Sequence, residues 1–174
     1  MNQPLDLVRY DAVSEGEFSA YMDEWDASGE RITPSATDRK GRGFEEMRRK
    51  WAAGEAEPYT PGLVPATLFF LTGPEGRILG AIHLRHDLND RLRLNGGHIG
   101  YGIRPSERRK GYGSLMLKKL LEALRAQGWD RVLLTCDEDN PGSRRIIETS
   151  GGVLADQVEF EGAMTRRYWI ELRQ

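Results

Sequence analysis

The chain has 174 residues, of which 39% are hydrophobic, a length that supports one domain with a closed core and excludes two large domains. Its formal net charge is only −2 although 30% of the residues are charged, which excludes a global electrostatic attraction to nucleic acid or to an anionic membrane. The single cysteine, Cys136, excludes an internal disulfide and a cysteine-based zinc cluster, so we expect no metal.

The same features predict a compartment. A lone cysteine agrees with a reducing environment, and the first residues lack the basic and apolar regions of a secretory signal. No later apolar run approaches the length that spans a membrane. We therefore expect a soluble, cytoplasmic protein that has no nucleic-acid or membrane partner.

The N-terminal part predicts a strand followed by two helices of opposite charge. Residues 5–10 alternate apolar and polar side chains, and Ser14 with Glu17 resembles a capping box at the start of a helix. Residues 11–30 hold seven acidic side chains and no basic one, whereas residues 39–50 hold six basic ones. Three prolines in residues 55–65 then predict an irregular connection.

The middle of the chain predicts a hairpin and a third strand. Residues 66–71 and 77–84 flank a turn that is rich in glycine and proline. In residues 97–103, apolar side chains alternate with Gly100 and Gly102, so we expect another group to approach this bare backbone closely.

The C-terminal part alternates helices and strands. Four leucines at helical spacing lie before Gly128, and residues 131–136 form an apolar run typical of a buried strand, which we expect beside residues 97–103 and parallel to them. Asn140 and Pro141 favour the start of a short helix, and residues 153–172 predict a closing hairpin. The leucines are Leu117, Leu120, Leu121 and Leu124.

A glycine-containing basic turn before the leucine-rich helix predicts an anion site. The first amides of a helix are unpaired and carry partial positive charge, and glycine at Gly111 and Gly113 would let phosphate oxygens reach the backbone. Arg108, Arg109 and Lys110 would add charge. The alternative is an ordinary surface turn with solvated basic side chains. The sequence lacks the common P-loop and the third glycine of a dinucleotide fingerprint.

Residues 97–152 resemble the GNAT acetyltransferase superfamily in the order of strand, turn, helix, strand and helix. The similarity is most specific over residues 103–113, where Arg109 replaces a glycine that is usual in the family. The resemblance implies an α/β fold with a mixed sheet of about seven strands, splayed between the fourth and fifth, and about four helices. It also implies one domain over residues 1–174, with an acceptor side in 1–62, an acyl-CoA-binding core in 66–152 and a closing hairpin in 153–174.

The resemblance further implies that acetyl-CoA is the co-substrate. Its pyrophosphate would lie on the turn, and its pantetheine arm would pair with the backbone of the strands that end at Ile103 and near Cys136. Asn140 and Ser143 resemble family positions that contact this arm, although Asn140 could equally be an ordinary helix cap. The implied cofactor-binding residues are Ile103, Arg108, Arg109, Lys110, Gly111, Tyr112, Gly113, Ser114, Asn140 and Ser143.

Direct attack of an amine on the thioester needs a proton acceptor and a way to stabilise the leaving thiolate. His98 lies where the family often has a proton-accepting group, and it is the candidate catalytic residue; the alternative is a histidine that is hydrogen-bonded within the sheet. His83 and His86 are weaker candidates.

The clearest departure from the family is Ile147, at the place of a tyrosine that protonates the thiolate in many members. Cys136, Tyr101 or Tyr168 could replace it, or the thiolate could leave unprotonated. Cys136 reads first as inert core packing, because no base lies near it in the sequence.

The acceptor stays open at this stage. Small amines, amino-acid derivatives and protein N-termini all fit, and the acidic residues 11–30 either attract a cationic amine or are simply solvated. A homodimer is common among similar proteins. Two other functions stay open as well: an acyl-CoA-binding module without turnover, which Ile147 favours, and a phosphate-binding domain for another nucleotide.

Overall fold

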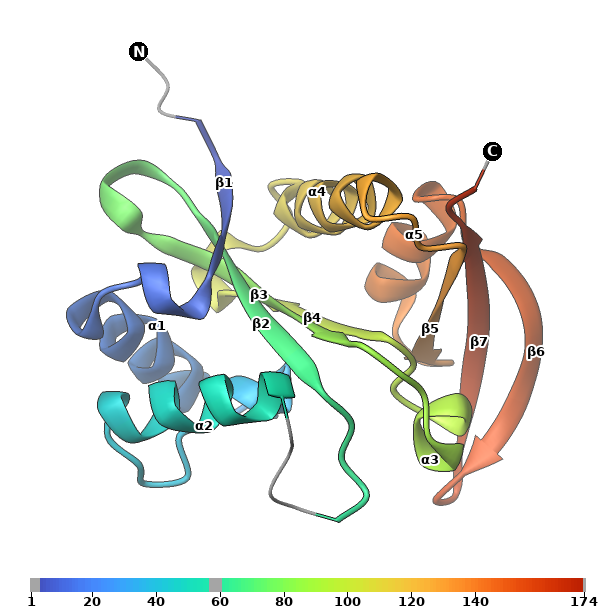
Figure 1. Ribbon diagram of the computed structural model, residues 1–174, viewed down its shortest axis with the longest axis horizontal. Coiled ribbons are helices and arrows are strands. Elements are labelled where there is room, and N and C mark those ends of the chain that lie inside the picture. The colour runs from blue at the N-terminus through green and yellow to red at the C-terminus, as the bar shows by residue number, and fades with distance from the viewer. Residues whose placement is uncertain (1–3, 57–60, 174) are drawn as a thin grey trace.

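A computed structural model describes residues 4–56 and 61–173 of the chain. Within them, seven strands form two antiparallel sheets that are split between β4 and β5 (Figure 1). The first sheet has the order β1-β2-β3-β4, and the second has the order β5-β7-β6. The strands are β1 Asp6–Arg9, β2 Ala66–Thr72, β3 Ile78–Arg85, β4 Ile99–Ile103, β5 Arg131–Asp137, β6 Val153–Phe160 and β7 Ala163–Glu171.

Helices cover both faces of the first sheet. Helices α1 and α2 pack on one face, and α4 packs on the other (Figure 1). Helix α5 contacts α4 and β5. The helices are α1 Glu15–Ser28, α2 Phe44–Ala56, α3 Asp90–Leu94, α4 Tyr112–Ala126 and α5 Pro141–Thr149.

The predicted elements are confirmed, with one helix more than expected. Helix α3 has only five residues in a polar stretch, and it is capped by Asn89, whose side chain accepts a hydrogen bond from Leu92 N at 2.9 Å. Part of the irregular connection over residues 55–65 lies outside the described residues. No helix in the described ranges is long and apolar enough to cross a membrane.

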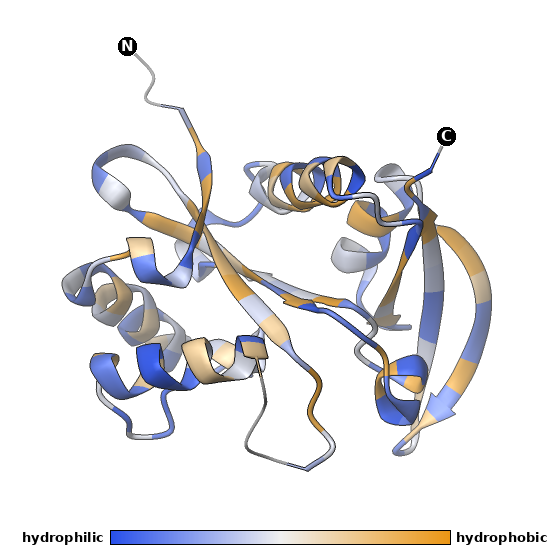
Figure 2. Cartoon of the chain, viewed as in Figure 1, coloured by the Kyte–Doolittle hydropathy of each residue, from blue (hydrophilic) through white to orange (hydrophobic). Residues whose placement is uncertain are grey.

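Two hydrophobic cores follow from this layering. One lies between the sheets and the leucine-rich face of α4, and the other joins aromatic residues of α1 and α2 to β2, with Phe18 packed edge to face on Trp51 and Phe70. Figure 2 shows the apolar residues running along the strands and on alternating turns of α4. The sheet is thereby fixed between the two helical layers.

The strands β4 and β5 are in contact, as the sequence analysis expected of neighbouring strands, but they belong to separate sheets. No ladder joins them in the described residues, and His98 N donates to Leu133 O at 2.8 Å just before β4 begins. Beyond this bridge the two sheets separate, as the resemblance implied.

The group that approaches the bare backbone of β4 belongs to the protein itself. A Cβ atom added to Gly102 would lie 2.0 Å from Thr33 O, in the segment between α1 and α2. Glycine is therefore needed at this position so that the segment can rest on β4.

Candidate active site

The basic turn has the geometry of an anion site. Arg109 and Gly111 both have left-handed backbone, with φ of 61° and 81°, and α4 begins directly after them. The first amide that bonds back into the helix is Leu115 N, which donates to Gly111 O at 3.1 Å. The amides of residues 109–114 donate to no acceptor in the described part of the chain, and Gly111 is exposed. A row of unpaired main-chain donors thus lies at a helix N-terminus.

The basic side chains of the turn contribute less than their number suggests. Lys110 Nζ lies 2.9 Å from Glu107 Oε2, and Arg108 forms an ion pair of 2.7 Å with Glu30 while its guanidinium packs on the ring of Trp25. Of the three basic side chains in the turn, only Arg109 has no acidic partner among the described residues. Main-chain amides and Arg109 therefore provide most of the attraction for an anion.

Gly113 has a packing role besides the predicted cofactor contact, which stays a prediction. A Cβ atom at this position would lie 2.7 Å from Ile146 Cδ1, so glycine lets α4 pack against α5. Gly111, around which an added Cβ would meet nothing within 4 Å, is the glycine that leaves the backbone open.

An ion-pair cluster that the sequence analysis missed fixes the approach to the turn. Arg104, buried at the end of β4, donates to Glu24 at 2.6 Å and to Glu17 at 2.7 Å. Glu24 also accepts from Ser106 N at 2.5 Å. Burial alone would raise the pKa of Glu24, but the hydrogen bonds from Arg104 and Ser106 lower it to about 2. Glu17 and Glu24 lie two helical turns apart, and this spacing is the signal that could have revealed the cluster.

Glu17 also shows how the predicted capping box is altered. Ser14 Oγ accepts from Glu17 N at 3.2 Å, which is half of the box. The Glu17 carboxylate instead accepts from Ile78 N at 2.9 Å and binds Arg104. The residue that would cap α1 thus ties α1 to the sheet.

The gap between the sheets is bridged by hydroxyl groups. Tyr101 Oη lies 2.8 Å from Ser143 Oγ, and burial raises the pKa of Tyr101 to about 12. Asn140 Oδ1 accepts from Ser143 N at 3.1 Å, which confirms its role as the cap of α5. The structure therefore brings Tyr101, Asn140 and Ser143 together where the pantetheine arm is expected.

His98 is held as a structural histidine would be. Its Nδ1 accepts from Leu133 N at 2.9 Å, and its ring packs edge to face on Trp129 and Trp169. Burial lowers its pKa to about 4. The lone pair that would take a proton from an amine is already occupied, so this geometry favours the structural alternative, although a catalytic role is still a prediction.

The other candidate groups are either buried or already hydrogen-bonded. Ile147 is fully buried in the core, and the Cys136 thiol is also buried, which raises its pKa. Tyr168 donates to Glu148 at 3.0 Å, and His86 Nε2 lies 2.8 Å from Thr67 Oγ1. Tyr101 is therefore the candidate proton donor that faces the gap.

The acidic residues of α1 are largely neutralised by arginines. Besides the partners of Arg104 and Arg108, Asp23 and Asp26 both bind Arg39. An attraction of this helix for a cationic amine is correspondingly reduced.

A split sheet whose fourth strand leads through a basic, glycine-containing turn into a helix is typical of the acyl-CoA-dependent acyltransferases that the sequence resembles. Residues 7–153 match the family described as acetyltransferase (GNAT) domain, and the chain belongs to this family. No curated protein matches the chain.

Solved structures of low sequence identity share the fold. The dodecameric spermidine N-acetyltransferase of Vibrio cholerae has a TM-score of 0.65 at 16% identity, over 97% of this chain and 94% of its own. The ribosomal L7/L12 alpha-N-protein acetyltransferase RimL has a TM-score of 0.64 at 13% identity, over 97% and 93%. A putative phosphinothricin N-acetyltransferase has a TM-score of 0.61 at 18% identity, over 98% and 100%.

Proposed function

We propose that the protein transfers an acetyl group from acetyl-CoA to a primary amine by direct attack in a ternary complex. The observation that carries this proposal is the row of unpaired amides at residues 109–114, which lies at the N-terminus of α4 beside the split between the sheets. Family membership supports the same chemistry.

The cofactor is held by three sets of groups in this proposal. The turn from Arg108 to Ser114, which includes Tyr112, binds the pyrophosphate mainly through main-chain NH groups. The backbone up to Ile103 pairs with the pantetheine arm, and Asn140 and Ser143 contact the arm from the other side of the gap. Residues 66–152 form this cofactor core, with the acceptor bound by residues 1–62 and by the hairpin of residues 153–174.

The departing thiolate requires little help, because its pKa is not far above neutrality. The Tyr101 hydroxyl faces the gap and provides a hydrogen bond that can stabilise it, since Ile147 cannot donate one. His98 contributes by holding β4 against β5 at the narrow end of the gap.

We propose that the chain acts in the cytoplasm as a homodimer. The exposed apolar side chains of Val153, Leu154 and Met164 on the outer hairpin support self-association. Light scattering after gel filtration would report a mass of two chains, and a mass of one chain would refute the dimer.

The activity is tested by following thiol release from acetyl-CoA in the presence of a broad panel of amines. We expect release that depends on both substrates. Saturable acetyl-CoA binding without release for any amine would instead support the second candidate, a module that binds acyl-CoA without turnover, which the buried Ile147 favours.

A further inference from the structure

A half-buried arginine on the α1 and α2 side of the sheet has no acidic partner in the described residues. Arg85 Nη1 donates to the carbonyl oxygens of Gly96 and Gly97 at 2.8 and 3.2 Å. Burial lowers its pKa, and a Cβ atom on Gly100 would lie 3.3 Å from Nη2, so the guanidinium lies over the bare backbone of β4. Partial burial of a charge without a counter-ion is unfavourable, and an anionic ligand would reduce this cost.

His83 and Lys50 continue from Arg85 toward α2, and of these two only Lys50 adds positive charge at neutral pH. His83 lies two residues earlier on the same face, since Ala81 packs into the core formed with α1 and α2. Burial and the positive charges of Arg85, His86 and Lys50 lower the pKa of His83 to about 3. The charge of Lys50, on α2, therefore reaches His83 in the sheet.

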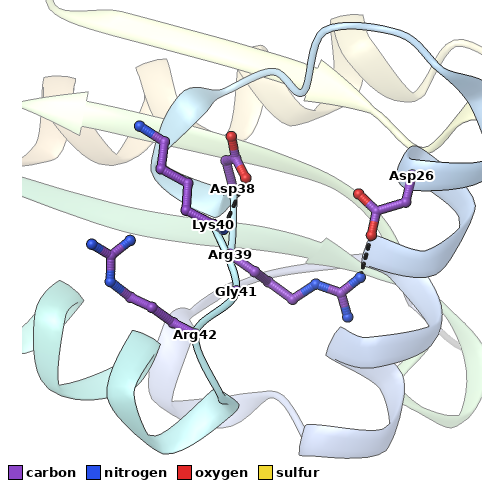
Figure 3. Close-up of a pocket in the computed structure, with 6 residues that line it drawn as sticks. All are labelled: Asp26, Asp38, Arg39, Lys40, Gly41 and Arg42. Carbon is purple, nitrogen blue, oxygen red and sulfur yellow. Dashed lines mark hydrogen bonds and ion pairs between the residues drawn. The ribbon is translucent and has the colours of Figure 1, made fainter.

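Beyond Lys50, toward the start of α2, the surface forms a hollow (Figure 3). The hollow has a volume of about 450 Å³ and is lined by Asp26, Asp38, Arg39, Lys40, Gly41 and Arg42.

At the hollow, Arg39 binds Asp26, whereas the side chains of Lys40 and Arg42 do not bind the carboxylates that line it. Lys40 and Arg42 project to the other side of the loop (Figure 3). Arg42 Nε lies 3.4 Å from Glu46, but its Nη1 is buried and has no acceptor among the residues described.

Lys40 and Lys50 both lie near Asp38. Burial and the charges of Arg42 and Lys40 lower the pKa of Lys50, which Asp38 opposes. Asp38 itself accepts from Lys40 N at 3.1 Å. We define the basic band as Arg85, Lys50, Lys40 and Arg42.

The band lies next to the strand that borders the gap. Thr33, in the segment that leads to the hollow, rests on Gly102 of β4, and Arg85 lies over Gly100 of the same strand. An acceptor that approaches the gap from this side would therefore meet positive charge, whereas the carboxylates of Glu17, Glu24 and Glu30 are paired with arginines.

We propose that the basic band binds an anionic group of the acceptor, so that the acceptor is an amine that also carries a carboxylate or a phosphoryl group. This inference rests on the proposed acetyl transfer. An acceptor with an anionic group would distinguish this chain from an enzyme that acts on a polyamine.

The first test measures kcat and KM for matched acceptors: glycine against glycinamide, phosphoethanolamine against ethanolamine, and spermidine. The test variant combines Lys40→Asn with Lys50→Gln. Asparagine tolerates the φ of 46° at position 40, and neither lysine forms an ion pair in the described structure. Arg49→Gln, on the exposed side of the same helix, is the matched control.

The wild type should prefer the anionic member of at least one pair, and the double variant should lose about tenfold or more of that preference, mainly through KM. The control should keep it. Preference for spermidine or for the neutral acceptors, or an unchanged double variant, would overturn the proposal.

A second test does not depend on turnover. Inorganic phosphate, and separately acetate, are titrated into the full chain while amide resonances of residues 38–43 and 50 are followed by NMR. Saturating CoA occupies the turn at Gly111, so that phosphate binding there does not interfere. We expect saturable shifts that the double variant abolishes, and no shift at these residues would refute the anion site. Failure of CoA to bind would count against the proposed function, not against the band.

Discussion

At the scale of single residues, the turn before α4 combines strain with openness. Arg109 adopts φ of 61°, which costs a residue with a side chain about 1 kcal/mol, whereas Gly111 adopts φ of 81° without this cost. The Lys110 ammonium is held by Glu107. These conformations explain why the backbone at Gly111, more than the charge of Lys110, should govern cofactor binding.

We therefore predict that Gly111→Val weakens acetyl-CoA binding more than about tenfold, because valine is strained at this φ and shields the amides. Lys110→Ala should weaken it less than about threefold, because the lysine is already paired. Calorimetric titration of both variants, with thermal melts to confirm folding, measures the difference. Equal losses would mean that side-chain charge dominates.

His98 allows a second prediction at this scale. His98→Leu leaves Leu133 N without its acceptor and should lower the free energy of unfolding by about 1–3 kcal/mol. If the role is structural, kcat/KM should fall only a few-fold at a temperature where the variant is folded. A loss of about 100-fold or more, together with the loss of a pH limb seen in the wild type, would show that His98 accepts the proton.

At the scale of elements, Arg104 joins three parts of the chain that surround the site. It binds Glu17 and Glu24 of α1 and the carbonyl oxygen of Ile78, while Glu24 also holds Ser106. The start of the turn is thereby fixed against α1.

We predict that Glu24→Gln lowers the free energy of unfolding by about 2 kcal/mol at neutral pH, because Arg104 keeps only one carboxylate partner. The pKa of Glu24 is lowered from 4.5 to about 2 in the folded state, so its contribution is complete above pH 4.5 and is lost as the pH falls toward 2. Urea unfolding from pH 7 to 2.5 should show the two proteins converging in acid. Glu159→Gln on an exposed strand is the control, and a gap that stays constant with pH would contradict this account.

At the scale of the whole molecule, the sequence predicted the order of elements well because each long element has a clear period. The leucines of α4 and the apolar run of β5 specify burial locally, and the caps Ser14 and Asn140 were both found. Helix α3 was missed because five residues, of which only Leu92 and Leu94 are apolar, are too few to show a helical period.

The site was less predictable, because side-chain partners come from distant parts of the chain. Arg108 reads as a phosphate ligand in the sequence, yet Glu30 and Trp25 hold it in the fold. Gly113 reads as part of the phosphate turn, yet it makes room for Ile146. The open backbone at Gly111 and the cap at Asn140 follow from local sequence.

The most direct test of the central claim is calorimetric titration of the full chain with acetyl-CoA at concentrations up to millimolar, repeated with ATP. We predict saturable binding of one acetyl-CoA per chain and much weaker binding of ATP. No heat and no saturation with acetyl-CoA, or a clear preference for ATP, would contradict the account.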